Sequence, residues 1–153
     1  MCGIFLVFSK NGHHLPKERC KEASSELYNR GPDFFKYNFL RNNSLYISNT
    51  ILSITGNPDK KNSINQSLNK NYFISYNGEI YNYLDLCKRY LPNFTNKESI
   101  TDTNVLLNLH EKIKYNYIPK LLNGMFAYVV YNSKKDELII ANDVQGEKNL
   151  FFF

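Results

Sequence analysis

The first stretch of the chain, Met1-Cys2-Gly3-Ile4-Phe5 (MCGIF), opens an apolar run that continues to residue 9 and ends before Lys-Asn-Gly. Such a short run with a β-branched residue predicts a buried strand at the very N-terminus. A cysteine inside an apolar strand usually packs as a small hydrophobic group. Position two permits a second interpretation, because removal of Met1 would leave Cys2 with a free α-amino group. One residue would then carry both a nucleophile and a general base.

Donors for a nucleophile at Cys2 are predicted just after a strand expected at residues 72–76, where the sequence reads YNGEIYN over residues 76–82. The side-chain amide of Asn77 and the backbone N–H of Gly78 suit a developing oxyanion, and each such donor is typically worth about 10²- to 10³-fold in rate. Asn-Gly is also among the commonest turn dipeptides, so a plain hairpin turn is the competing interpretation.

The rest of the chain mixes strand and helix signals without internal repeats. A polar loop is expected over residues 56–70. The strands expected after the first one cover 45–48, 51–55, 72–76, 125–131 and 137–142. The expected helices cover 15–27, 84–91, a stretch from 101 or 102 to 113, and 118–122, the last with its C-cap at Asn123-Gly124.

Composition indicates one folded domain over residues 1–153, with 42% hydrophobic and 22% charged residues. The net charge of +5 comes from basic residues interleaved with acidic ones, which argues against a nucleic-acid surface. No apolar stretch is long enough for a membrane span, and the apolar start lacks the basic region of a signal peptide. Three cysteines without a CxxC pair fit a reducing compartment, so a cytoplasmic protein is expected.

Five segments, in order along nearly the whole chain, resemble the class II, N-terminal-nucleophile glutamine amidotransferase domain of asparagine synthetase-like proteins. They are MCGIF, YNRGPD, YNGEIYN, TDTNVLL and the C-terminal stretch LLNGMFAYVVYNSKKDELIIANDVQGEKNLFFF. The co-occurrence is specific, although no single segment is. The resemblance implies the four-layer αββα sandwich of N-terminal-nucleophile hydrolases, an α+β fold, over residues 1–153.

The resemblance also implies hydrolysis of glutamine to glutamate and ammonia through a cysteinyl thioester. Cys2 matches the nucleophile and base, and Asn77 and Gly78 match the oxyanion donors. Gly78 and Glu79 match positions that line the substrate, and Asp102 matches the carboxylate that holds the glutamine α-ammonium group. A carboxylate at a helix start is a good ammonium partner, and it is an equally good N-cap.

One departure from the family pattern concerns the glutamine-binding segment, which in the family reads approximately Arg-Leu-Ser-Ile. Here the matching substrate-binding stretch is Ile51, Leu52, Ser53, Ile54 and Thr55, so Ile51 replaces the arginine that pairs with the substrate α-carboxylate. Arginine binds a carboxylate through two charge-assisted hydrogen bonds that isoleucine lacks. An unpaired carboxylate in a closed pocket costs several kcal/mol.

The resemblance further suggests that the chain is a C-terminally truncated domain, because it stops on Phe151-Phe152-Phe153 at the start of a strand. In family members the ammonia passes to an ATP-dependent synthetase domain, which is absent from this sequence. ATP and magnesium are expected only there, and the glutaminase half needs no cofactor. His13, His14 and His110 lack metal-ligand spacing and are predicted to be surface or loop histidines, so no metal is expected.

Three functions remain open at this point. The first is an active glutaminase that supplies ammonia to a partner chain or synthetase domain. The second is a catalytically impaired homologue kept as a binding or assembly module, which the loss of arginine at Ile51 suggests. The third is an amidohydrolase that uses Cys2 on an amide without an α-carboxylate, because an apolar group at position 51 suits such a ligand.

Overall fold

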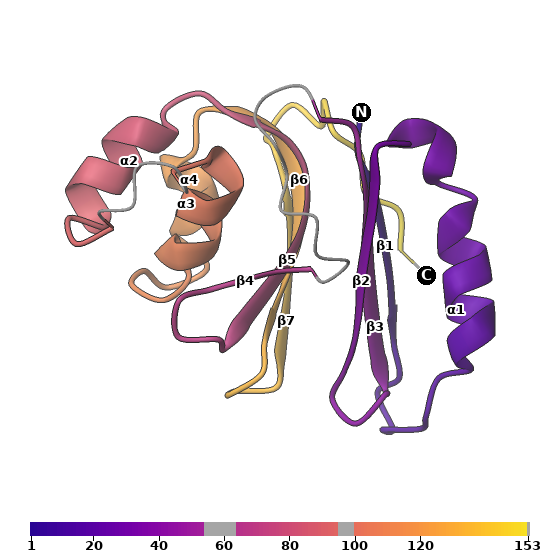
Figure 1. Cartoon of the computed structure of the whole chain (residues 1–153). Helices are drawn as coiled ribbons and strands as arrows, with labels where there is room; N and C mark the ends of the chain where they lie inside the picture. The colour runs from indigo at the N-terminus through magenta and orange to yellow at the C-terminus, as the bar shows by residue number, and fades with distance from the viewer. Residues whose placement is uncertain (54–63, 95–99, 153) are drawn as a thin grey trace. The chain divides into compact units, whose positions relative to one another are not determined.

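The structure is a computed structural model that describes residues 1–53, 64–94 and 100–152. The chain forms two compact units. The first comprises Met1–Ile64 with Ser75–Asn77, and the second comprises Asn65–Ile74 with Gly78–Phe153. Both combine helices with antiparallel strands (Figure 1), so the predicted mixture of α and β structure is confirmed. Within the described ranges, no helix has the length and apolar character needed to cross a membrane.

The first unit is built on a three-stranded antiparallel sheet in the order β1-β3-β2. Strand β1 (Gly3–Phe8) and strand β2 (Phe34–Leu40) both pair with the central strand β3 (Leu45–Ile51). All residues of β3 before Ile51 are buried, because they lie between two neighbouring strands. The register sets Gly3 opposite Thr50 and Phe34 opposite Ile51, which places the start of β1 beside the end of β3.

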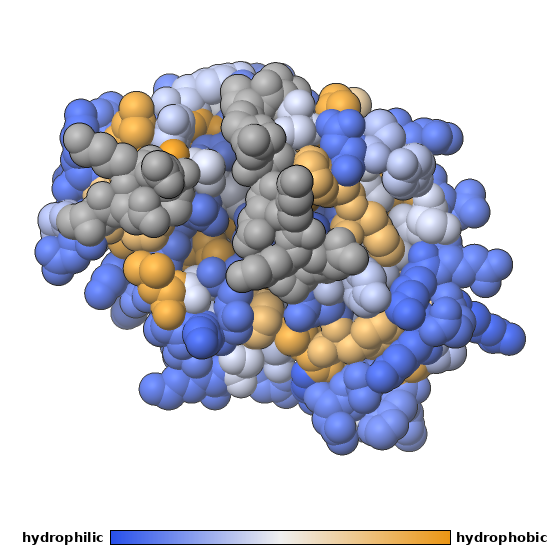
Figure 2. All heavy atoms as spheres, in the orientation of Figure 1, coloured by the Kyte–Doolittle hydropathy of each residue, from blue (hydrophilic) through white to orange (hydrophobic). Residues whose placement is uncertain are grey.

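Helix α1 (Lys17–Ser25) lies along this sheet and is followed by the short helix η1 (Tyr28–Arg30) (Figure 1). It buries only Cys20 and Ser24, and the Ser24 hydroxyl lies 2.8 Å from the Tyr46 hydroxyl of β3. Figure 2 shows mostly hydrophilic residues over this helix. Lys17 and Lys21 of α1 each lie with Nζ 5.6 Å from an aromatic ring centre of β2, and Lys21 also pairs with Glu18 at 3.3 Å.

The second sheet has the order β4-β5-β6-β7. Its strands are β4 (Asn65–Gln66), β5 (Tyr72–Ile80), β6 (Gly124–Asn132) and β7 (Glu137–Asn142). Its helices are α2 (Tyr83–Tyr90), α3 (Asp102–Leu109) and α4 (Ile118–Leu121). Residues 105–109 of α3 are all buried, and α3 packs on α2. A helix here is confirmed, but five consecutive buried residues cover all sides of it, so the predicted amphipathic pattern is wrong.

The structure corrects several predicted elements. Strand β2 was missed, although its aromatic residues alternate with Lys36 and Asn38 in the pattern of a strand. The strands expected at 45–48 and 51–55 are one strand that ends at Ile51, while residues 54 and 55 lie outside the described residues. Helix α3 ends at Leu109, short of residue 113. The C-cap of α4 is Leu122, and Gly124 begins β6 instead of capping the helix.

Strand β5 corrects the most consequential of these predictions. It continues to Ile80, so Asn77-Gly78 lies inside a strand and the hairpin-turn interpretation is wrong. Gly78 has φ of 152°, and an added Cβ would collide with the Met125 carbonyl oxygen of β6. Only glycine tolerates both the backbone angle and this close approach. Strand packing therefore requires Gly78 directly after Asn77.

Candidate active site

Cys2 is half-buried and is held through its nitrogen, its sulfur and its carbonyl oxygen. Its backbone nitrogen donates to Asn77 Oδ1 at 3.1 Å. Its Sγ lies 4.0 Å from the Leu52 carbonyl oxygen, and its own carbonyl accepts a hydrogen bond of 3.3 Å from Arg30 Nε. The nitrogen bonded to Asn77 is the atom that becomes the α-amino group if Met1 is removed. The first unit thus brings the predicted nucleophile Cys2 and the predicted donor Asn77 together.

Asn49 positions the neighbours of Cys2 and Asn77, and it was not predicted as a site residue from the sequence. Its side chain is 8% exposed in the middle of β3. Asn49 Nδ2 donates to the Gly3 carbonyl at 2.8 Å, and its Oδ1 accepts from the Tyr76 backbone nitrogen at 3.4 Å. It therefore connects the residue after Cys2 with the residue before Asn77. The available signal was the polar run Ser48-Asn49-Thr50 between apolar residues of one strand, because a buried amide needs such partners.

The Arg-Gly-Pro-Asp segment, residues 30–33, packs against the end of β3. A Cβ added to Gly31 would lie 2.5 Å from the backbone nitrogen of Ile51, so only glycine permits this approach to the end of β3. The Asp33 carboxylate accepts a 2.7 Å hydrogen bond from the Ser53 backbone nitrogen. The Asp33 nitrogen donates to the Ile51 carbonyl at 3.1 Å. The segment therefore fixes the chain that follows β3.

Ile51 is the last residue of β3 and is half-buried. It pairs with Phe34 and forms an isolated bridge with Pro32. The next residue, Leu52, is 36% exposed and offers its carbonyl to Cys2. The segment predicted to bind substrate thus begins beside Cys2, with an apolar side chain at its first position. Ile54 and Thr55 from the same prediction lie outside the described residues.

The other predicted site residues, Gly78, Glu79 and Asp102, belong to the second unit. Glu79 is exposed on β5. Asp102 Oδ2 accepts from the backbone nitrogen of Ile80 at 3.3 Å, and its Oδ1 accepts from the nitrogen of Thr103 at 2.7 Å. The start of α3 therefore lies against the end of β5. Asp102 is not the N-cap of α3, since Thr101 takes that role and its side chain accepts from Asn104 N at 3.2 Å.

The three cysteines are free and differ in their surroundings. Cys20 in α1 and Cys87 in α2 are buried, and desolvation raises the pKa of both thiols. A raised pKa keeps a thiol protonated and unreactive. Cys2 is the most accessible of the three. Structural packing is therefore the role of Cys20 and Cys87.

The histidines give one correction. His110 follows α3 and is only 4% exposed, so its prediction as a surface or loop histidine is wrong on burial. His13 and His14 are exposed as predicted. In the part of the chain that the structure describes, no group of three or more His, Cys, Asp or Glu side chains is placed to hold a metal ion.

Comparison with known proteins gives a consistent result. The model of the glutamine amidotransferase domain family matches residues 1–153. Asparagine synthetase [glutamine-hydrolyzing] 1 of Saccharomyces cerevisiae is 30% identical over 154 residues, which cover 99% of this chain and 25% of that protein. A putative asparagine synthetase [glutamine-hydrolyzing] 2 of Methanocaldococcus jannaschii is 31% identical over 170 residues, covering 100% of this chain and 32% of that protein.

A more distant relative is a probable asparagine synthetase [glutamine-hydrolyzing] of Acanthamoeba polyphaga mimivirus. It is 27% identical over 154 residues, which cover 99% of this chain and 27% of that protein. The chain thus spans about a quarter to a third of the length of these relatives. The family match covers every segment on which the resemblance was based. The chain therefore belongs to the glutamine amidotransferase domain family and is a glutamine amidotransferase domain of the asparagine synthetase-like type.

Proposed function

We propose that this domain hydrolyses glutamine to glutamate and ammonia, with Cys2 as the nucleophile. The observation that carries the proposal is the 3.1 Å hydrogen bond between the Cys2 nitrogen and Asn77 Oδ1. After removal of Met1, this contact would hold the α-amino group beside its own thiol. An amine so held is an effective general base, because α-amino groups titrate near neutral pH.

The reaction proceeds in two halves. The α-amino group of Cys2 takes the thiol proton, and the thiolate attacks the carboxamide carbon of glutamine. The tetrahedral intermediate collapses when the protonated amine returns a proton to the leaving nitrogen, which departs as ammonia and leaves a thioester. Water, deprotonated by the same amine, then attacks the thioester. Glutamate is released and the thiol is restored.

Asn77 has two roles in this mechanism. Its Oδ1 accepts from the Cys2 nitrogen, so its Nδ2 is left as a donor to the oxyanion of the tetrahedral intermediate. The backbone N–H of Gly78 is the second donor, at a residue whose backbone conformation is fixed by the close approach of β6. Fixed donors stabilise the developing charge without reorganising during the reaction.

The proposed fold is the four-layer αββα sandwich of N-terminal-nucleophile hydrolases. Asp102 then holds the glutamine α-ammonium, and Gly78 and Glu79 line the substrate. The hydrogen bond from Ile80 to Asp102 supports this role, since it holds that carboxylate beside the end of β5.

The ammonia acceptor is proposed to be an ATP-dependent synthetase domain or chain, in which ATP and magnesium would act. The names of the relatives support this proposal, because they are asparagine synthetases described as glutamine-hydrolysing. We also propose a reducing compartment such as the cytoplasm. The three free cysteines are consistent with it.

Ile51 favours a second candidate function. Its half-buried apolar side chain directly precedes Leu52, whose carbonyl lies near the Cys2 sulfur. The family pattern has a carboxylate-binding arginine at this position. A pocket without that guanidinium would bind glutamine weakly or would suit an amide that lacks an α-carboxylate. A chain unable to turn over any amide would be an impaired homologue that serves as a binding or assembly module.

Ammonia release from glutamine tests these alternatives directly. The parent chain, Cys2→Ala and Cys20→Ala are assayed together, the last as a matched control in α1. We expect activity in the parent and in Cys20→Ala, and none in Cys2→Ala. If the parent and Ile51→Arg both release no ammonia from glutamine, the glutaminase proposal fails. Release from a simple amide such as γ-aminobutyramide alone would favour the amidohydrolase.

A further inference from the structure

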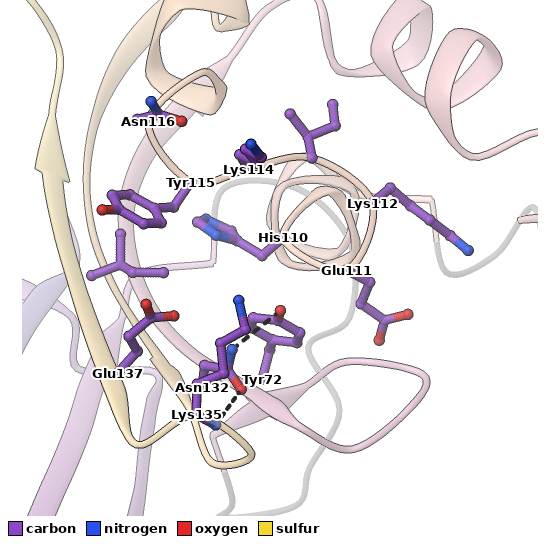
Figure 3. A pocket seen from close by; sticks show the side chains of 12 residues that line it. Tyr72, His110, Glu111, Lys112, Lys114, Tyr115, Asn116, Asn132, Lys135 and Glu137 are labelled. Carbon is purple, nitrogen blue, oxygen red and sulfur yellow. Dashed lines mark hydrogen bonds between the residues drawn. The ribbon is translucent and has the colours of Figure 1, made fainter.

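A pocket of about 430 Å³ lies in the second unit, away from every residue assigned to glutamine hydrolysis. It is bounded by the chain that follows α3, by the β6–β7 hairpin and by Tyr72 of β5. Small-molecule sites typically have volumes of about 300 to 1,000 Å³. This pocket is therefore large enough for a metabolite of modest size (Figure 3).

His110 contributes a buried polar atom to the pocket wall. Its ring lies 6.2 Å from the Tyr72 ring and 5.6 Å from the Tyr128 ring, measured between centroids. Its Nε2 is buried and has no hydrogen-bond partner among the described residues. Burial lowers the pKa of His110 to about 4, so the imidazole is neutral at pH 7. A buried polar atom without a partner is costly, and a ligand atom would relieve that cost.

Charged groups of both signs surround this wall. Glu137 of β7 and the lysines Lys114 and Lys135 line the pocket. Figure 3 shows Glu137 and His110 extending toward the same space, whereas the charged ends of Glu111 and Lys112 point away from it. Among these described pocket residues, no salt bridge joins Glu137 to Lys114 or Lys135 at contact distance.

We propose that this pocket binds a free acidic α-amino acid, with one ammonium and two carboxylate groups. Glu137 would receive the ammonium group, and Lys135 and Lys114 would each face a carboxylate. His110 Nε2 would hydrogen-bond the ligand at the pocket wall. The charged ends of Glu111 and Lys112 point away from the pocket (Figure 3). Of the charged residues that line it, this leaves two cationic groups and one anionic group, which match one cationic and two anionic groups in the ligand.

Other ligand classes fit these residues less well. An inorganic anion would meet the Glu137 carboxylate without offering it a positive charge. An organic cation without carboxylates would meet two lysines. A metal ion is disfavoured because the described residues contain no cluster of three metal-ligating side chains. The three charges together therefore favour a ligand that carries both signs.

Binding is tested by titrating the 153-residue chain with L-aspartate and following backbone amide shifts by NMR. L-Aspartate is chosen because L-glutamate would also be the product at the proposed active site. Succinate lacks the ammonium group, and L-alanine lacks the second carboxylate, so both serve as matched ligands. We expect saturable shifts at residues 110–116 and 132–139 with L-aspartate, and binding at least about tenfold weaker with either control ligand.

Variants then assign the contacts. Lys135→Ala and Glu137→Gln should each weaken L-aspartate binding by about fivefold to tenfold. Lys134→Ala is the matched control, because Lys134 lies in the same turn but does not line the pocket. It should bind as the parent does. All of these variants should keep the parent's rate of ammonia release from glutamine, so failure here is separate from failure of the glutaminase proposal.

Three outcomes would overturn the proposal. The first is the absence of saturable shifts at tens of millimolar L-aspartate. The second is a set of shifts confined to residues around Cys2, Asn77 and Asp102, which would mean binding at the proposed glutamine site only. The third is equal binding of L-aspartate and succinate, which would show that the ammonium group is not recognised by Glu137.

Discussion

The polar groups around Cys2 and those around His110 differ in their hydrogen bonding. Around Cys2, the side chains of Asn49, Asn77 and Arg30 all bond to backbone atoms of β1, β5 or Cys2 itself. Around His110, the imidazole Nε2 and the Tyr128 hydroxyl have no hydrogen-bond partners among the described residues. Burial also shifts the pKa of both groups against their charged forms.

This difference suits the Cys2 region to positioning and the His110 region to ligand recognition. Hydrogen bonds between protein groups hold Cys2 in one geometry, as a nucleophile requires before its substrate arrives. The unpartnered Nε2 of His110, which lines the pocket, instead carries a cost in the free protein that a ligand can remove. The first region should therefore be sensitive to the loss of any one contact. The second should be sensitive to pH and to ligands.

Asn77 gives the largest expected effect on the first region. Asn77→Ala removes the contact to the Cys2 nitrogen and the oxyanion donor together, so ammonia release should fall by about 10²- to 10³-fold or more. Asn77→Asp is the matched variant, because it keeps an acceptor for the nitrogen and loses the donor. Steady-state assays should find both variants impaired. Parent-like rates in Asn77→Ala would remove Asn77 from the mechanism.

The pH dependence of stability should reveal His110. Its pKa is about 4 when folded against an ordinary value of 6.5, so below pH 6.5 the unfolded chain binds a proton that the folded chain does not. Stability contributed by the neutral ring is fully present above pH 6.5. It is lost progressively down to about pH 4, by about 3 kcal/mol in total.

Urea unfolding between pH 4 and 7.5 measures this effect. Glu111 and Glu137 line the same pocket as His110, so the parent is compared with His110→Phe, which keeps both carboxyl groups. As the pH falls, the unfolding free energy of the parent should decrease by about 3 kcal/mol more than that of the variant. A constant difference across this range would mean that His110 is not buried as a neutral ring.

Ile51 tests how far the first region is adapted to glutamine. Restoring a guanidinium with Ile51→Arg should lower the Michaelis constant for glutamine by one to two orders of magnitude, about 1.5 to 3 kcal/mol, with little change in turnover. The α-carboxylate lies away from the reacting amide, so its binding affects ground and transition states alike. A changed turnover with an unchanged Michaelis constant would contradict this account of position 51.

Asn49 should give the smallest effect of the four. Asn49→Ala leaves the Gly3 carbonyl and the Tyr76 nitrogen without their partner, which should cost about 1 to 2 kcal/mol of stability. Thermal unfolding measures this cost, with Asn11→Ala, an exposed turn residue, as the control. Ammonia release should fall as well, because Asn49 connects the neighbours of Cys2 and Asn77. Equal stability of the two variants would remove Asn49 as a positioning residue.

The sequence predicted those parts of the fold that depend on local pattern. The strand after Cys2, the start of α3 and the β6–β7 hairpin were found from apolar spacing and turn residues. Strand β2 and the continuation of β5 through Asn77-Gly78 were missed. The continuation of β5 depends on its pairing with β6, which is distant in sequence and leaves little trace in local composition. Strand β2 pairs with β3, the next strand along the chain, and carries the alternating pattern of a strand.

The site residues likewise fall into those that local motifs predicted and those that depend on distant partners. Cys2 and Asn77 were predicted to act together, and they are in contact. Asn49 and the buried His110 were not recognised, because their roles depend on partners that are distant in sequence. For Asn49 these partners lie 46 and 27 residues away. Asp102 was located, while the choice of Thr101 as the N-cap was settled only by side-chain geometry.

The most direct test of the central claim, that Cys2 is the nucleophile, is labelling of the native chain with an electrophilic diazoketone analogue of glutamine. Intact mass and peptide mapping then report which cysteine reacts and whether Met1 has been removed. We predict one adduct per chain, on a Cys2 whose Met1 is gone, while the buried Cys20 and Cys87 stay unlabelled. Equal labelling of all three cysteines, or retention of Met1 in every molecule, would contradict the account.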